Sequence, residues 1–151
     1  MKILAYLTIL VFVAISCSTD SGTETLSVKE KILGTWIVQS AVVNGSAISI
    51  QGTPFELVEA RFQEDSYLYI FPKVLDNGLV SSTETDQISG SWELNEEGTK
   101  IYLDRSDYGQ STFEWDILEL SVGNMRTRYY EMAAGSESDT SEYIITYQLD
   151  G

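Results

Sequence analysis

The side chains that most often carry out catalysis are nearly absent from this sequence, which contains one cysteine, Cys17, and no histidine. Nucleophiles assisted by histidine and the common zinc-binding sets are therefore ruled out, because Cys17 is expected to carry lipid. A pair of carboxylates could still hydrolyse a substrate, but 23 acidic residues are too many for any two of them to define a site. We predict no catalytic residue, no cofactor and no metal site, and we do not expect an enzyme.

Acidic residues could instead hold a calcium ion, which prefers oxygen ligands. The candidates lie late in the chain, at Asp104, Asp107, Glu137, Asp139 and Glu142, and none of them has the spacing of an EF-hand. Solvated loop acids are the favoured interpretation, and calcium binding is the alternative.

Cys17 lies where an apolar segment gives way to a polar one. Lys2 supplies a positive charge, residues 3–15 are almost wholly apolar, and the small Ser16 precedes Cys17. This order is typical of a secretory signal peptide, and the run is shorter than the about 20 residues that a membrane-spanning helix needs. Residues 14–17 resemble a bacterial lipobox, which implies cleavage before Cys17 and acylation of that residue, although Ala14 replaces the usual leucine. An ordinary signal peptide with a chance cysteine is the alternative.

The chain is thus predicted to have three parts. Residues 1–16 form a lipoprotein signal peptide, residues 17–27 the lipidated cysteine and a flexible tether, and residues 28–151 one domain. Several acyl chains anchor a protein stably where one is marginal. Ser18 resembles the outer-membrane sorting signal of lipoproteins, so the expected location is the bacterial cell envelope, at the outer membrane. The membrane face stays open.

Net charge limits the partners of the mature chain. Removal of residues 1–16 takes away Lys2 and no acid, which leaves 8 basic and 23 acidic residues and a net charge of −15. Nucleic acids and anionic lipid surfaces require a basic patch, so neither is an expected ligand. A basic protein partner suits this charge better.

The domain is predicted to consist of strands. Gly34 and Trp36 open a β-branched run that Asn44 and Gly45 close, and Asn-Gly is the strongest short-range signal for a hairpin. Further along, apolar residues mostly alternate with polar ones, as they do in half-buried strands. A short helical turn is expected over residues 28–33. We expect about eight to ten strands, no long helix and antiparallel neighbours.

Alternation also predicts which side chains share a strand face. Tyr67, Tyr69 and Phe71 share one face of a strand that Pro72 is expected to end. A switch of apolar parity indicates a bulge near residues 117–118, and residues 47–50, 55–62 and 79–82 are weaker strand candidates. The other shared faces comprise Ile88, Gly90, Trp92 and Leu94; Phe113, Trp115 and Ile117; Met125, Thr127 and Tyr129; and Tyr143, Ile145, Tyr147 and Leu149.

Several fragments occur in an order that resembles the bacterial lipocalin-like lipoproteins. They are Leu33-Gly34-Thr35-Trp36, Arg61-Phe62 with Asp65-Ser66-Tyr67, Gly90-Ser91-Trp92-Glu93-Leu94, and Asp116-Ile117-Leu118-Glu119-Leu120. The resemblance implies an all-β fold, an antiparallel up-and-down lipocalin-like barrel of about eight strands preceded by a short helical turn. The chain departs from animal lipocalins in having no disulfide and no long helix after the barrel.

The resemblance also implies roles for a few residues. Gly34 and Trp36 correspond to the start of the lipocalin barrel, and a late arginine, Arg126 or Arg128, is expected to stack on Trp36; exposed strand charges are the alternative. Residues 106–108, Ser-Asp-Tyr, are similar to a lipocalin Thr-Asp-Tyr element, although chance explains so short a match equally well.

Two functions are compatible with such a barrel. An eight-stranded barrel of this size is filled by side chains or holds one small ligand. The first hypothesis is an apolar or amphipathic ligand, whose predicted contacts are Tyr67, Tyr69, Phe71, Phe113, Trp115 and Tyr129, whereas Trp36 and Trp92 are expected in the core. The second is an acidic interaction or inhibitor module with a packed barrel.

Overall fold

A computed structural model describes residues 25–75, 79–105, 112–132 and 140–151. The described part contains nine strands, one short α-helix and one 3-10 helix, so it is an all-β domain. The elements in chain order are α1 Val28–Ile32, β1 Gly34–Val43, β2 Ser46–Ile48, η1 Pro54–Leu57, β3 Glu59–Phe62, β4 Ser66–Val74, β5 Val80–Leu94, β6 Lys100–Leu103, β7 Phe113–Ser121, β8 Asn124–Met132 and β9 Thr140–Leu149.

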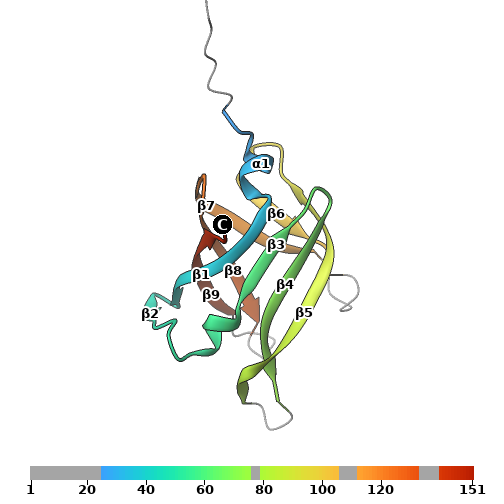
Figure 1. The fold of residues 1–151 in the computed structure, drawn as a ribbon. Coiled ribbons are helices and arrows are strands. Elements are labelled where there is room, and N and C mark those ends of the chain that lie inside the picture. The colour runs from blue at the N-terminus through green and yellow to red at the C-terminus, as the bar shows by residue number, and fades with distance from the viewer. Residues whose placement is uncertain (1–24, 76–78, 106–111, 133–139) are drawn as a thin grey trace, which may run out of the picture.

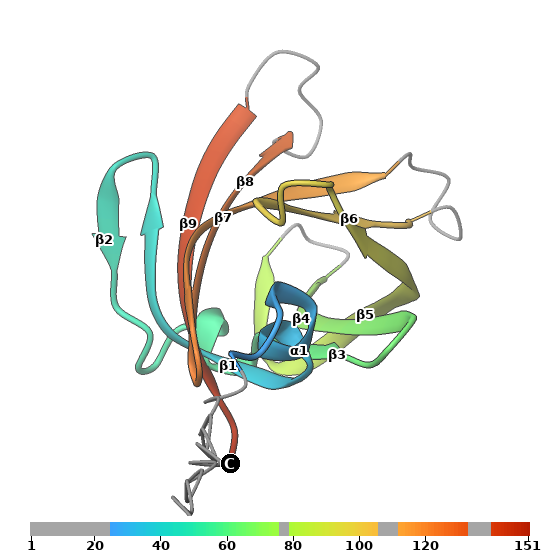
Figure 2. The same cartoon turned by 90° about the horizontal axis from the view of Figure 1, so that it is seen from above.

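Eight of these strands close into an antiparallel barrel. From β3 to β9 each strand pairs with the next one along the chain, and β1 closes the ring by pairing with both β3 and β9. The short β2 lies outside the ring and pairs only with β1. Figure 1 shows the barrel from the side, and Figure 2 shows the ring of strands from the end where α1 lies. The predicted up-and-down barrel is confirmed.

The first hairpin forms where Asn-Gly predicted it. Val43 pairs with Ser46, and the two turn residues, Asn44 and Gly45, have φ angles of 48° and 77°. Such angles define the tight turn that matches the twist of two antiparallel strands, and they favour asparagine and glycine. The register between β1 and β9 shifts between Val38 and Ser40. Along its other edge, β1 pairs with β3 through residues 34–37 and with β2 through residues 41–43.

Three predicted strand boundaries were wrong. Pro72 does not end its strand but lies inside β4, opposite Thr85. Strand β3 begins at Glu59, opposite Ile70, so beyond Ile70 strand β4 pairs only with β5, and a proline is tolerated at such an edge. Residues 55–62 contain most of η1 and all of β3, joined by Val58, and residues 80–82 form the start of the long β5, with residue 79 outside it. The bulge predicted near residues 117–118 is confirmed by a register shift between Ile117 and Glu119.

Helix α1 lies across one end of the barrel (Figure 1), and two buried tryptophans, Trp36 and Trp92, fill the interior near that end. Ser27 and Glu30 form a capping box that starts α1, and Ile32 at its last residue is fully buried. The Nε1 of Trp36 donates a hydrogen bond of 2.7 Å to the Ile32 carbonyl, and the Nε1 of Trp92 donates one of 2.6 Å to the Gln63 carbonyl. The predicted core positions of both tryptophans are confirmed, and this end of the barrel is packed.

Gly34 is required where β1 leaves α1. Its φ is 132°, which side chains other than glycine rarely adopt. A Cβ at this position would lie 2.5 Å from Cδ1 of Leu149 in the neighbouring β9. The glycine therefore permits both the entry angle of β1 and its close approach to the last strand.

Arg126 and Arg128 lie on the outer face of β8 and not against Trp36. Their neighbours Met125, Thr127 and Tyr129 are buried, so the two arginines point outward. Nη1 of Arg126 lies 3.0 Å from Oε1 of Glu119, and Nη2 of Arg128 lies 2.8 Å from Oδ2 of Asp116. The expectation of stacking on Trp36 was wrong, and the alternative of exposed strand charges is correct.

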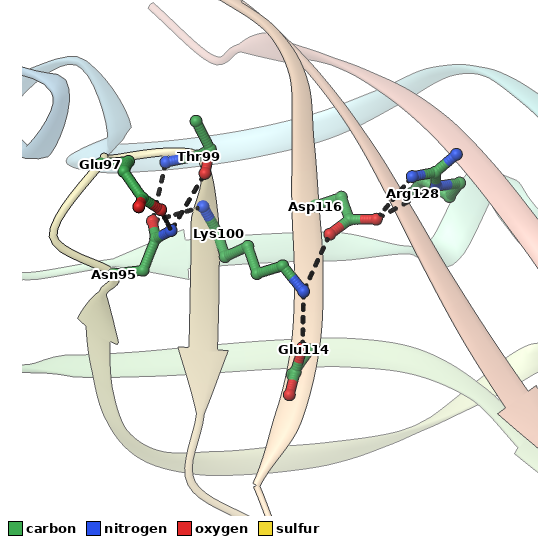
Figure 3. Close-up of polar contacts among 7 residues, drawn as sticks. All are labelled: Asn95, Glu97, Thr99, Lys100, Glu114, Asp116 and Arg128. Carbon is green, nitrogen blue, oxygen red and sulfur yellow. Dashed lines mark hydrogen bonds and ion pairs between the residues drawn. The ribbon is translucent and has the colours of Figure 1, made fainter.

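The outer face of β6, β7 and β8 carries a ladder of alternating charges (Figure 3). Nζ of Lys100 lies 3.0 Å from Glu114 and 3.5 Å from Asp116, which also accepts both hydrogen bonds from Arg128. These hydrogen bonds, chiefly those from Arg128, lower the pKa of Asp116. Opposite charges on neighbouring strands stabilise the pairing of that sheet face.

Some predictions concern residues outside the described ranges. They are the signal peptide, Cys17, most of the tether, residues 106–108, and the acids Asp107, Glu137 and Asp139. Neither helix of the described part is long and apolar enough to cross a bilayer.

Candidate ligand-binding site

A cavity of about 460 Å³ lies between the strands at the end of the barrel away from α1. Its walls come from η1, from the later half of β4, from β5, and from the facing ends of β8 and β9. In Figure 1 these segments gather at the end where the β4–β5 hairpin projects. The larger wall residues are mostly aromatic or apolar, namely Phe55, Tyr69, Phe71, Ile88, Tyr129 and Tyr143.

The floor of the cavity is a layer of stacked aromatic rings. Tyr129 lies in the middle of the stack, with its ring 5.1 Å from that of Tyr143 and 5.6 Å from that of Trp115. Trp115 also stacks on Tyr147 at 5.9 Å, and the rings of Trp115 and Tyr69 meet edge to face at 5.4 Å. Trp115 and Tyr147 are fully buried. The barrel is therefore packed below this layer and hollow above it.

Hydroxyl groups lie at the level of this floor. The hydroxyls of Tyr69 and Tyr129 are 3.5 Å apart, and Tyr147 is buried next to Tyr69. Burial raises the pKa of Tyr69 to about 12 and the pKa values of Tyr129 and Tyr147 well above their ordinary value. These hydroxyls stay protonated at neutral pH, so they are neutral groups that both donate and accept hydrogen bonds.

The predicted ligand contacts fall into three groups. Tyr69, Phe71 and Tyr129 line the cavity. Trp115 and Phe113 lie behind the wall, and the ring of Phe113 meets that of Tyr129 edge-on at 5.3 Å. Tyr67 shares a strand face with Tyr69, but it is buried near the packed end, where its hydroxyl donates a 2.8 Å hydrogen bond to the Asp104 carbonyl.

Two charged residues of the cavity, Arg105 and Glu131, were not predicted. Nη1 of Arg105 lies 3.8 Å from Oε1 of Glu131, and the guanidinium lies over the ring of Phe113, 4.8 Å from its centroid. Burial raises the pKa of Glu131, and the charge of Arg105 opposes that rise. Strand alternation contained the signal for both residues. Glu131 continues the inward series that ends at Tyr129, and Arg105 lies two residues beyond the buried Leu103.

A second hollow, of about 520 Å³, lies on the outer face of β3, β4 and β5. Its lining includes Arg61, Gln63, Ser66 and Ser89, which are exposed residues of that face. A site for a small apolar molecule is usually concave, mostly apolar and marked by a few polar groups. The inner cavity fits this description, and the outer hollow does not.

Comparison with solved structures finds similar barrels. A bovine odorant-binding protein in complex with a selenium-containing odorant matches with a TM-score of 0.50 and 12% identity, over 84% of this chain and 74% of that one. A lipocalin-like protein from Bacteroides uniformis matches with a TM-score of 0.49 and 15% identity, over 80% and 99% of the two chains. An uncharacterized protein from Bacteroides eggerthii matches with a TM-score of 0.47 and 12% identity, over 78% and 98%.

At these identities the likeness concerns the fold alone. No protein-family model and no curated protein matches the sequence. The closed eight-stranded antiparallel barrel with one additional strand, together with the likeness to the odorant-binding barrel, makes this a lipocalin-like domain. The fold implied by the sequence resemblance is confirmed.

Proposed function

We propose that this protein is a lipoprotein of the bacterial cell envelope, anchored through Cys17, whose lipocalin-like barrel binds a small apolar or amphipathic molecule. The cavity above the floor of Tyr69 and Tyr129 is the observation that supports this function. Its volume of about 460 Å³ lies within the range of roughly 300–1,000 Å³ that is typical of small-molecule sites. The protein binds its ligand without chemical change, and neither a metal nor a cofactor takes part.

The uneven filling of the barrel favours this function over that of a packed interaction module. Beneath the tyrosine layer, Trp115 and Tyr147 leave no room for a ligand, and the end covered by α1 is filled by Trp36 and Trp92. The opposite end is hollow and mostly apolar. The bovine odorant-binding protein of similar fold binds an odorant, which provides an example of a small molecule bound by such a barrel.

The position of α1 relates the cavity to the proposed anchor. The described chain begins at Thr25 and enters the barrel through α1 (Figure 1). The segments that line the cavity lie at the far end of the barrel. A lipid on Cys17 and a ligand in the cavity would therefore belong to opposite ends of the domain. The net charge of −15 also remains compatible with a basic protein partner on the outer surface.

Filling the cavity tests the proposed function. Val80 lines the cavity and is exposed at the start of β5, so Val80→Trp adds volume at the cavity without disturbing the buried core. We expect the affinity for N-phenyl-1-naphthylamine, a neutral apolar fluorophore, to fall by about tenfold, a loss of about 1.4 kcal/mol. Val122→Trp is the control, because Val122 is exposed in the β7–β8 turn and does not line the cavity. Equal binding by the two variants, or no binding by the unmodified protein, would contradict the proposed function.

A further inference from the structure

Arg105 is a charged residue in an unusual position for this barrel. Its side chain is only 13% exposed, and it lies in the wall of a cavity that is otherwise mostly apolar. A guanidinium cannot lose its charge in a protein, and a buried charge is costly unless it is paired and hydrogen-bonded. The contacts of Arg105 therefore indicate what the cavity can accept.

Those contacts leave the guanidinium incompletely satisfied. Its Nε is buried and has no hydrogen-bond partner among the described residues. Its Nη1 is 3.8 Å from Oε1 of Glu131, which is longer than the roughly 2.7–3.2 Å of an N–H···O hydrogen bond. The ring of Phe113 contacts one face of the group but accepts no conventional hydrogen bond. Glu131 thus lowers the electrostatic cost of the charge, while at least the Nε–H donor has no partner in the part of the chain that the structure describes.

The two charges also differ in depth. The side chain of Glu131 is 43% exposed, whereas that of Arg105 is 13% exposed. A ligand that lies on the cavity floor meets a guanidinium that is largely withdrawn from solvent, where a hydrogen bond between charged groups is stronger than in water. A cation would have to approach Glu131 and lie close to Arg105, which would repel it. The geometry favours an anionic group over a cationic one.

We infer that Arg105 is the anchoring residue of the cavity and that it binds the carboxylate of an amphipathic ligand, whose apolar part lies against Tyr69, Phe71 and Ile88. This inference rests on the proposed function, because it requires that the cavity takes a ligand at all. A planar carboxylate matches the fork of N–H donors on a guanidinium and accepts two of them at once. The hydroxyls of Tyr69 and Tyr129 stay neutral, so they do not repel a carboxylate.

Three competitors with the same tail separate the ligand's charge from its apolar part. N-phenyl-1-naphthylamine is bound to the purified protein at neutral pH and displaced with dodecanoate, dodecanol or dodecylammonium, each below the concentration at which it forms micelles. A hydrogen-bonded carboxylate–guanidinium contact corresponds to a preference of roughly 10- to 100-fold. We expect dodecanoate to displace the fluorophore at a concentration at least about tenfold lower than dodecanol, and dodecylammonium to be the weakest competitor.

Variants at both charges test the role of Arg105 itself. Arg105→Gln should remove the preference for dodecanoate while the affinity for dodecanol changes by less than about twofold, and Arg105→Lys should retain part of that preference. Glu131→Gln should increase the preference, because it removes the competing carboxylate. Arg126→Gln is the matched control, since it removes the same charge from the outer face.

The outcomes distinguish this inference from the proposed function. If the fluorophore binds but dodecanol competes as well as dodecanoate, the ligand role of Arg105 is refuted and the binding cavity remains. Equal weakening of all three competitors by Arg105→Gln would show a purely structural role, and a weaker dodecanoate preference in Glu131→Gln would also overturn the inference. If the fluorophore does not bind at all, the proposed function itself fails.

Discussion

Replacement of Trp36 by alanine should destabilise the domain by about 3–5 kcal/mol, the usual cost of deleting a large buried aromatic side chain. Trp36 is fully buried at the packed end, and its Nε1 supplies a hydrogen bond of 2.7 Å to the carbonyl of Ile32, the last residue of α1. Trp36→Phe keeps most of the ring but leaves that carbonyl without its partner, which costs about 1–3 kcal/mol. The two variants therefore separate the contribution of volume from that of the hydrogen bond.

Equilibrium unfolding in urea measures both effects. Trp92 and Trp115 remain as fluorophores, so the transition stays visible in either variant. Ile37→Ala provides the control, because Ile37 is the next residue in β1, points outward and is 37% exposed; its cost should stay below about 1 kcal/mol. A cost for Trp36→Ala no larger than that of Ile37→Ala would refute the assignment of Trp36 to the core.

Three further predictions concern other parts of the molecule. Hydrogen bonds from Arg128 lower the pKa of Asp116. The ionised Asp116 carboxylate therefore stabilises the fold at pH values above the ordinary aspartate pKa. This contribution is lost as the pH falls through the lowered pKa of the folded protein. Asp116→Asn should therefore cost about 0.5–1 kcal/mol at neutral pH and nothing in strong acid, and a constant difference across unfolding curves at both pH values would contradict the assignment. Cys17→Ala should abolish incorporation of labelled palmitate by the producing cells while the domain still folds; undiminished labelling would reject the anchor. Gly34→Ala should lower stability by about 1–3 kcal/mol, because φ is 132° and the new Cβ would meet Leu149. Thermal unfolding of both proteins measures this loss, and a loss smaller than that range would contradict the prediction.

The fold was predictable because turn residues and the alternation of apolar and polar residues within short stretches of this sequence indicate its strands. Asn44 and Gly45 fix a tight turn, and the alternation in β4, β8 and β9 assigns each side chain to one face of the barrel. The strand boundary at Pro72 could not be predicted from neighbouring residues in the sequence. A strand can continue through a proline where no neighbouring strand needs an N–H donor at that position, and the pairing of β4 with β3 extends only as far as Ile70.

The candidate site was predictable only in part. Tyr69, Phe71 and Tyr129 were expected from their strand faces, but those faces do not show how far along the barrel the packing extends, so Tyr67 and Trp115 were placed in the cavity as well. That limit depends on contacts between strands that are distant in sequence.

The charged residues were missed for a different reason. A charge on a strand is ordinarily expected to face solvent, and Arg126 and Arg128 do so. Arg105 and Glu131 are charged as well but line the cavity, Glu131 at an inward position of β8 and Arg105 two residues after the end of β6, in step with the inward Leu103. For these two residues, the expectation that a charged side chain faces solvent was wrong, and the alternation of inward and outward positions gave the correct direction.

Native mass spectrometry tests the central claim, that the cavity holds a small molecule, most directly. The protein is purified gently from its own envelope, equilibrated with excess N-phenyl-1-naphthylamine in a second sample, and weighed in native and denatured forms. Acyl groups on Cys17 are covalent and stay with the denatured chain, whereas a molecule in the cavity leaves. We expect an additional mass that is present in the native protein and lost on denaturation, and that the fluorophore replaces in the second sample. Identical native and denatured masses in both samples would contradict the claim.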